Sequence, residues 1–118
     1  MLLIYTAERE APPDEMARVA ATHREVMADA AKASVFVAAE PLRPTSTATT
    51  VRRQGERFLT IDGPFAETKE QLAGYYILDC RDLDEAIAWA RRIPTACGGG
   101  EGCVEIRPID PRAASPDA

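Results

Sequence analysis

Two side chains in this sequence have the chemistry of an acid/base centre, and they lie far apart in the chain. His23 is the only histidine, and an imidazole with its ordinary pKa of about 6.5 can act as a general base near neutral pH. Asp62 stands directly before Gly63 and Pro64, where its carboxylate could orient the imidazole or exchange a proton itself. We therefore take His23 and Asp62 as the candidate catalytic pair.

Both residues also have a structural interpretation. The spacing from Met16 places His23 on the apolar stripe of a predicted helix, where a histidine can be buried and satisfied by a backbone carbonyl. An Asp before Gly-Pro is a common turn former, because its carboxylate accepts hydrogen bonds from nearby backbone N–H groups. Whether His23 faces a cleft or the core stays open at this point.

Three further residues are candidates for substrate binding. Lys69 could bind an anionic substrate group and Glu67 could carry a proton, although a solvated helical turn with ion pairs of about 0.3–0.5 kcal/mol each also accounts for them. Tyr75 and Tyr76 point to opposite faces of one predicted strand. One of them is expected in the core and the other in a cavity between subunits, and we assign the ligand contact to Tyr75.

The sequence predicts no metal and no cofactor. Cys97 and Cys103 flank a Gly-rich segment and could form a disulfide under oxidation, but their spacing is not that of a zinc site, and a single histidine cannot complete one. The segment Gly98–Gly100 precedes a strand instead of opening a helix, which is the wrong context for a phosphate-binding loop.

Hydrophobic periodicity and turn signals predict the elements that must position these residues. One helix follows a cap at Asp14, and a second follows a cap at Asp82 and ends near Ile93 because Pro94 cannot continue it. The predicted strands are residues 2–5, 35–39, 47–51, 57–61, 74–80 and 104–109. A turn at Gln54-Gly55 joins two of them, and a short helical piece is expected over 66–71.

This order of elements is that of an α+β, ferredoxin-like βαββαβ fold with one inserted hairpin. Residues 1–110 are expected to form a single domain, and residues 111–118 a flexible C-terminal tail. In such a fold both helices cover one face of an antiparallel sheet. Because several predicted strands are apolar on both faces, the other face would form an exposed apolar patch. We infer a homodimer in which a second copy covers this face through a two-fold axis.

Charge and composition exclude several classes of partner. The formal net charge is −5, and the pairs Arg52-Arg53 and Arg91-Arg92 are too small for the clustered basic face of a nucleic-acid-binding protein. The apolar runs are far shorter than the ~18 residues of a membrane-spanning helix. The first residues lack the basic region of a signal peptide. Together with the 3 cysteines, this predicts a cytoplasmic protein with reduced thiols.

The stretch from Asp62 to Tyr76, DGPFAETKEQLAGYY, resembles the signature of the DGPF family, which is part of the YCII-related superfamily. The resemblance extends to residues 1–5, to the helix that carries His23, and to residues 46–51 and 104–108. Ala73 stands where a second glycine is common, residues 35–40 lack the usual glycines, and the connection from Cys97 to Cys103 is longer. The first two departures could alter a pocket wall or a strand bend.

The resemblance implies a ferredoxin-like fold of the dimeric α+β barrel type, and an enzymatic site built on a histidine and an aspartate. Some members of the family are fused to sigma-70-type factors, which implies a role in transcription initiation instead. Our leading hypothesis is a homodimer that binds a small polar or anionic organic molecule near His23 and Asp62, with cofactor-independent acid/base catalysis if it is an enzyme. The alternatives are a non-catalytic interaction module for a sigma factor and a ligand-sensing domain.

Overall fold

The computed structural model describes residues 1–95 and 102–111 of the chain. The elements run β1 (Leu2–Thr6), α1 (Pro13–Lys32), β2 (Phe36–Pro41), a 3-10 turn η1 (Thr45–Thr47), β3 (Thr49–Gln54), β4 (Arg57–Asp62), β5 (Gln71–Leu78), α2 (Leu83–Ala90) and β6 (Gly102–Ile106). Both predicted helices are present, and each predicted strand overlaps an observed one. No helix in the described part of the chain is long and apolar enough to cross a membrane.

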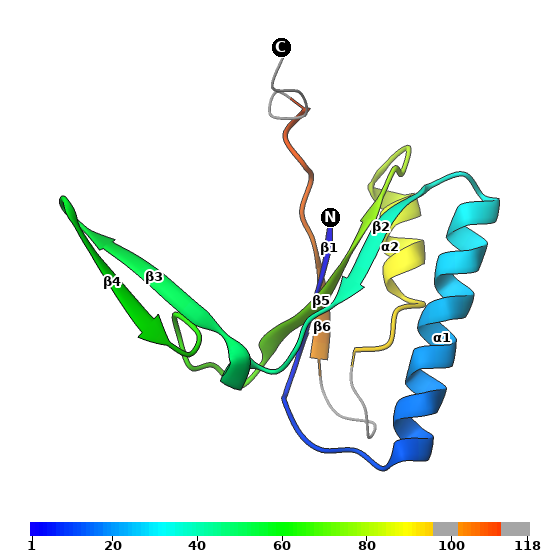
Figure 1. Cartoon of the computed structure of the whole chain (residues 1–118). Coiled ribbons are helices and arrows are strands. Elements are labelled where there is room, and N and C mark those ends of the chain that lie inside the picture. The colour runs from blue at the N-terminus through cyan, green and yellow to red at the C-terminus, as the bar shows by residue number, and fades with distance from the viewer. Residues whose placement is uncertain (96–101, 112–118) are drawn as a thin grey trace.

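Four of the strands form one antiparallel sheet in the order β2-β5-β1-β6. The central strand β1 places Leu2 opposite Tyr76 of β5 on one side and opposite Ile106 of β6 on the other. Figure 1 shows α1 and α2 on the same side of this sheet. The α+β architecture is therefore compatible with the predicted ferredoxin-like fold, with β3 and β4 as the inserted hairpin.

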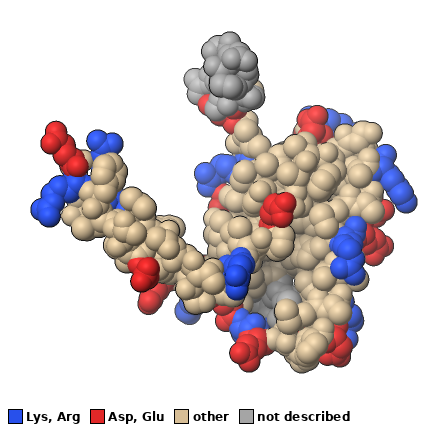
Figure 2. All heavy atoms as spheres, in the orientation of Figure 1, with Lys and Arg blue, Asp and Glu red and all other residues tan. Residues whose placement is uncertain are grey.

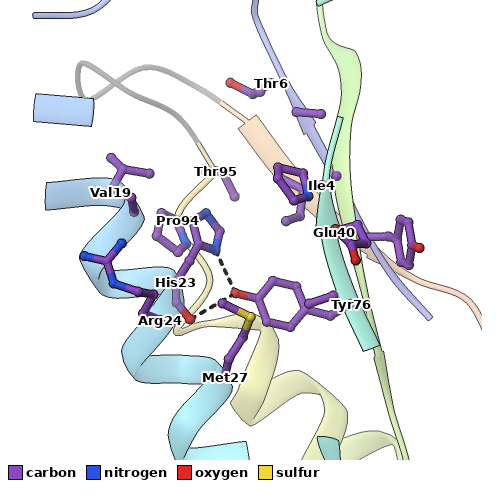
Figure 3. A pocket seen from close by; sticks show the side chains of 16 residues that line it. Ile4, Thr6, Val19, His23, Arg24, Met27, Glu40, Tyr76, Pro94 and Thr95 are labelled. Carbon is purple, nitrogen blue, oxygen red and sulfur yellow. Dashed lines mark hydrogen bonds between the residues drawn. The ribbon is translucent and has the colours of Figure 1, made fainter. Parts of the chain in front are cut away.

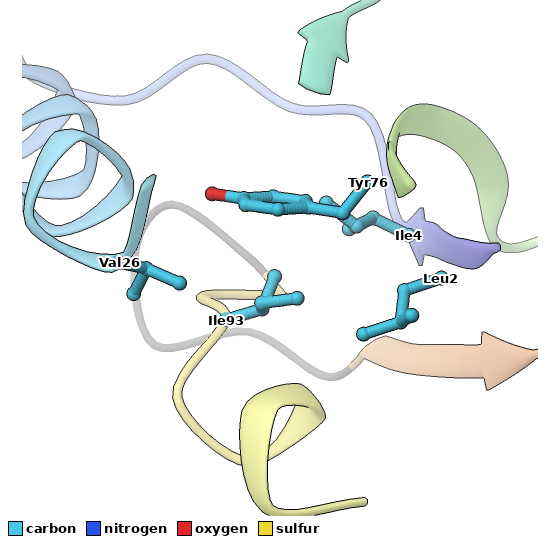
Figure 4. Packing of buried hydrophobic residues seen from close by; sticks show 5 residues of the cluster. All are labelled: Leu2, Ile4, Val26, Tyr76 and Ile93. Atoms are coloured by element: carbon cyan, nitrogen blue, oxygen red, sulfur yellow. The ribbon is translucent and has the colours of Figure 1, made fainter. Parts of the chain in front are cut away.

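The core lies between the sheet and the helices. It is built from Leu2 and Ile4 of β1, Val26 of α1, Tyr76 of β5, and Ile93 after α2. Leu2, Val26 and Tyr76 are each 2% exposed or less. Figure 4 shows the Tyr76 ring beside Ile4 with its hydroxyl directed toward α1. Because its ring is packed in the core, the position of the Tyr76 hydroxyl is fixed.

The two helices begin in different ways. The predicted cap at Asp82 is confirmed, because its Oδ1 accepts a hydrogen bond of 2.8 Å from the backbone N–H of Glu85. The predicted cap at Asp14 is wrong: Pro12 occupies the N-cap without a side-chain hydrogen bond, and Pro13 is the first helical residue. A proline suits this position because its φ is already helical and the N–H it lacks would have no partner there. Asp14 lies in the first turn instead.

Several predicted boundaries also need correction. No helix forms over 66–71, where β5 already begins at Gln71. Gln54 pairs with Arg57 in the hairpin, so the turn is formed by Gly55 and Glu56 instead of Gln54-Gly55. Gly55 has φ of 65°, a conformation that glycine adopts without strain. Cys97, Gly98–Gly100 and residues 112–118 of the predicted tail lie outside the described residues.

The β3–β4 hairpin, residues 49–62, forms a separate two-stranded sheet that projects away from the main sheet (Figure 1). We call it the arm. Every residue of β4 is exposed. The Asp62-Gly63-Pro64 turn ends the arm: Gly63 has φ of 105°, its N–H donates to the Ala48 carbonyl at 2.7 Å, and its carbonyl accepts from Thr50 Oγ1 at 2.8 Å.

Glu8 holds the base of the arm to the loop that follows β1. Its Oε1 accepts a hydrogen bond of 2.7 Å from the Thr45 backbone N–H, and its Oε2 accepts one of 2.8 Å from the Thr45 hydroxyl. The carboxylate therefore accepts hydrogen bonds from both donor groups of Thr45, which is the first residue of η1. This contact joins residues that are 37 positions apart, and no local pattern in the sequence indicates it.

Candidate functional site

A pocket of about 360 Å³ opens between α1 and the end of the sheet at which β1 and β2 finish. This volume falls within the range of about 300–1,000 Å³ that is usual for small-molecule sites. Most of the lining is apolar, and Val19, Met27, Ile4 and Pro94 contribute to it. The polar side chains on its wall include His23, Tyr76, Thr6 and Thr95. Figure 3 shows His23 on α1 facing Tyr76 from β5, with Val19 and Pro94 nearby.

His23 and Tyr76 form a hydrogen-bonded pair at the inner end of this pocket. The distance from His23 Nδ1 to the Tyr76 hydroxyl is 2.7 Å, and the same hydroxyl lies 3.5 Å from the His23 carbonyl oxygen. The two rings stack with centroids 5.8 Å apart. Because Tyr76 is anchored in the core, its hydroxyl fixes the orientation of the imidazole. Nε2, the other ring nitrogen, makes no hydrogen bond to the residues that the structure describes.

Burial shifts the pKa of both groups in the direction that keeps them neutral. Desolvation lowers the pKa of His23 below 6.5 and raises the pKa of Tyr76 to about 12. At pH 7 the pair is therefore an uncharged imidazole next to an uncharged phenol. A neutral imidazole is the form of histidine that can accept a proton.

The Tyr76 hydroxyl can support either tautomer of the imidazole. When it donates to Nδ1, the proton of His23 resides on Nε2, which then acts as a donor. When Nδ1 carries the proton and donates to the hydroxyl oxygen, Nε2 has a free lone pair, and the hydroxyl can turn its proton toward the His23 carbonyl. The pair can therefore present either a donor or a base at Nε2.

The structure does not bring the other predicted site residues to His23 within one chain. Asp62, Glu67 and Lys69 are all exposed, and none of them lines the pocket. Asp62 lies at the end of the arm, and its carboxylate makes no hydrogen bond or ion pair to a described residue. Tyr75 borders the pocket, but strand alternation sends its side chain to the face opposite Tyr76. The His23–Asp62 pair thus remains a prediction that only a second chain could fulfil.

Two residues at the pocket were missed by the sequence analysis. Tyr76 takes the orienting position that was assigned to Asp62; alternation indicated that one of the two tyrosines is buried, but only the strand register decides which. Arg24 follows His23 on α1 and lines the same pocket, and it forms no ion pair within the described ranges. No group of three or more His, Cys, Asp or Glu residues among those described could hold a metal ion.

These features define an α+β domain with a single histidine on the wall of an apolar pocket. The chain belongs to the YCII-related domain family, whose model matches residues 1–112. It is 47% identical over 68 residues to an uncharacterized protein of Rhizobium meliloti (strain 1021), a match that covers 58% of this chain and 54% of that protein. The chain thus spans about half the length of this curated relative.

Proposed function

We propose that the chain binds a small organic molecule in the pocket between α1 and the sheet, and that His23 exchanges a proton with it. The observation that carries the proposal is the Tyr76 hydroxyl at 2.7 Å from His23 Nδ1, because it leaves Nε2 as the reactive nitrogen on the wall of an apolar pocket. The pocket residues favour a ligand with an apolar body. Arg24 supplies a cation beside His23 for an anionic group of the ligand.

The chemistry that this arrangement supports is acid/base catalysis without a cofactor. In the tautomer with a proton on Nδ1, the Nε2 lone pair can accept a proton from a carbon or oxygen of the ligand. The imidazolium that forms then donates through Nδ1–H to the Tyr76 hydroxyl, and it returns the proton to another atom of the ligand or to water. An isomerisation, an elimination or a hydrolysis can use such a step. Asp62 takes part only if a second copy brings it to this pocket.

Binding can be tested with a set of small carboxylic acids and phenols, observed by NMR through the imidazole signals of His23. Because His23 is the single histidine, these signals need no assignment. We expect some of the compounds to shift them. Ala20→Phe, which places a ring in the pocket, should abolish the shifts. The matched control is Ala21→Phe, since Ala21 is exposed and does not line the pocket. Equal binding by both variants would refute the assignment of the pocket.

Proton transfer can be tested on the compounds that bind. Those with a C–H next to a carbonyl group should exchange that proton for deuterium faster in the presence of the protein in heavy water. His23→Gln should remove the acceleration, and Ala21→Phe should keep it. If the compounds bind but their C–H exchange is not accelerated, the catalytic part of the proposal is refuted. The chain would then be interpreted as a ligand-sensing domain.

A second candidate is the non-catalytic interaction module, and the arm is the observation that favours it. Phe58 on β4 is 63% exposed, and Phe65 after the arm is 78% exposed, as expected for a surface that meets another protein. A pull-down from native lysate that repeatedly recovers RNA polymerase components, and loses them with Phe65→Ala, would support this function. Recovery of the chain alone would count against it.

A further inference from the structure

We propose that the ligand of the pocket is a β,γ-unsaturated ketone, that Thr6 and Thr95 bind its carbonyl oxygen, and that His23 moves a proton along it to give the conjugated isomer. This inference rests on the proposed function, because it concerns the same pocket. It adds the class of substrate, the direction of the reaction and two further residues that contact the substrate.

Thr6 and Thr95 come from different parts of the chain, and both line the pocket. Thr6 is the last residue of β1 and, like Ile4, points to the side of the sheet that faces the helices. Gly102 of β6 pairs with Thr6. A Cβ added to Gly102 would lie 2.9 Å from Thr95 Cβ and 2.8 Å from the Tyr5 carbonyl oxygen. The glycine therefore allows Thr95 to approach the end of β1, where Thr6 lies.

Both hydroxyls are available to a ligand. The Thr95 hydroxyl makes no hydrogen bond to a residue that the structure describes, and the Thr6 hydroxyl makes only a weak one, of 3.4 Å, to the Ala7 carbonyl. Figure 3 shows both threonines on the side of the His23 ring that faces away from the Tyr76 hydroxyl. Because Nδ1 is bonded to that hydroxyl, the threonines lie on the side of Nε2. A ligand in the pocket can thus contact Nε2 and the two hydroxyls together.

The polar groups inside the pocket are uncharged. Burial lowers the pKa of His23 and raises the pKa of Tyr76 to about 12, so both are neutral at pH 7, and a threonine hydroxyl carries no charge. The charged residues of the lining, Arg24 and Glu40, are both exposed. Figure 2 shows charged side chains spread over the outside of the domain and at the far end of the arm. A charged group of a ligand would therefore stay at the mouth, and a neutral hydrogen-bond acceptor such as a carbonyl oxygen suits the interior.

Two hydroxyl donors on the same side as a base form the arrangement that enolisation requires. Nε2 of His23 removes a proton from the carbon next to the carbonyl group, and the electron pair of that C–H bond forms the C=C bond of an enolate. The negative charge on the carbonyl oxygen accepts hydrogen bonds from the two hydroxyls, which are already in place. The imidazolium then delivers the proton to the γ-carbon, and the remaining double bond is conjugated with the carbonyl group. Atoms and electrons balance without a second reactant.

The position of the double bond follows from the strength of the base. Because burial lowers the pKa of His23, its imidazole is a weaker base than in water. A C–H next to a carbonyl group alone gives up its proton slowly to such a base, whereas a C–H between a carbonyl group and a C=C bond gives a more delocalised anion. The conjugated product is the more stable isomer, which sets the direction. The apolar lining and the volume of about 360 Å³, near the lower end of the usual range, favour a small cyclic ketone.

The conversion of cyclohex-3-enone into cyclohex-2-enone by the full chain tests this inference, with proton NMR of the vinyl signals as the measurement. We expect the wild type to accelerate the conversion over buffer, and His23→Gln to remove the acceleration. Thr6→Val and Thr95→Val should each lower kcat about a hundredfold, as is typical for the loss of one oxyanion donor, while the ketone still shifts the imidazole signals. The matched control is Thr22→Val. Its hydroxyl bonds the Arg18 carbonyl on the exposed side of α1, so this variant should keep the full rate.

Serine variants separate a substrate contact from a structural role. Thr6→Ser and Thr95→Ser keep the hydroxyl and should retain the rate that the valine variants lose. No acceleration by the wild type, acceleration that survives in His23→Gln, or an unchanged kcat in either valine variant would overturn the inference. The proposed function is judged separately, by the imidazole shifts with carboxylic acids and phenols and by the deuterium exchange of the compounds that bind.

Discussion

His23 and Tyr76 are separated by 53 positions in the sequence, and their side chains meet at 2.7 Å in the fold. The tyrosine belongs to the core and the histidine to the pocket wall. A residue of the buried core therefore orients the single imidazole of the chain. A catalytic or ligand-binding histidine needs such an orienting partner, because the hydrogen bond at one ring nitrogen determines the role of the other.

Tyr76→Phe should keep the core packing and remove only the hydroxyl. Because the Nδ1 of His23 then loses its partner, the populations of the two tautomers should change, and the unfolding free energy should fall by about 0.5–1.5 kcal/mol. Nitrogen-15 chemical shifts of the single imidazole measure the first effect, and urea unfolding measures the second. Tyr75→Phe is the matched control, since its side chain lies on the other face of the strand. Equal tautomer populations in the wild type and in Tyr76→Phe would contradict the orienting role.

The lowered pKa of His23 predicts a specific dependence of stability on pH. Well above pH 6.5 the imidazole is neutral in both the folded and the unfolded chain, and the full contribution of His23 to stability is present. As the pH falls below 6.5, the unfolded chain takes up the proton first, so the unfolding free energy decreases until the folded chain is protonated as well. The slope from this one group is at most about 1.4 kcal/mol per pH unit.

This dependence can be measured as a difference between the wild type and His23→Gln. Subtracting the two unfolding curves removes the contribution of the carboxylates, which titrate in both proteins. A direct NMR titration of the imidazole should give a pKa below 6.5. A pKa above 6.5, or a difference curve that does not change with pH, would show that His23 is not desolvated in the folded chain.

The sequence predicts the elements well where a local pattern decides them. Asp82 caps α2 because the residue three positions later offers its N–H, which is a local relationship. The predicted helix over 66–71 fails because its polar groups find other local partners: the Thr68 hydroxyl donates to the Glu70 carbonyl at 2.5 Å, and the Gln71 side chain donates to the Thr68 carbonyl at 3.1 Å. Such bonds compete with helix formation and are not visible in hydrophobic periodicity.

The candidate site is less predictable because it depends on tertiary placement. The apolar stripe on α1 includes His23 but leaves open whether the imidazole faces a cleft or the core. Its partner depends on the register of β5 against β1, which puts Tyr76 and not Tyr75 beside Leu2. Asp62 was paired with His23 from residue chemistry and family resemblance alone. The projection of the arm away from the sheet (Figure 1), which separates the two within a chain, has no signal in the pattern of apolar residues along β3 and β4.

Glu8→Gln should loosen the base of the arm without unfolding the domain. The neutral amide can keep one of the two hydrogen bonds to Thr45 but loses the charge that strengthens both. We expect faster hydrogen exchange at the Thr45 amide and a loss of global stability below about 1.5 kcal/mol, because the contact is exposed. Glu10→Gln, on a neighbouring exposed carboxylate, is the control. Unchanged exchange at Thr45 would mean that Glu8 does not hold the arm.

Gly74 sets the close approach of β5 to β2 at the rim of the pocket. A Cβ added there would lie 2.9 Å from the Glu40 carbonyl oxygen and 3.3 Å from Pro41 Cα. These atoms are backbone and cannot rotate away, so Gly74→Ala must push β2 outward and strain the Leu42 N–H bond to the Ala73 carbonyl, which measures 2.8 Å. We expect the free energy of unfolding, measured with urea, to fall by about 1–3 kcal/mol, and we expect the pocket to widen.

The control is Gly55→Asn in the turn of the arm, since asparagine tolerates the positive φ of this position. Equal stability of the Gly74→Ala variant and the wild type would show that β2 moves freely at this rim, so the pocket could open and close there.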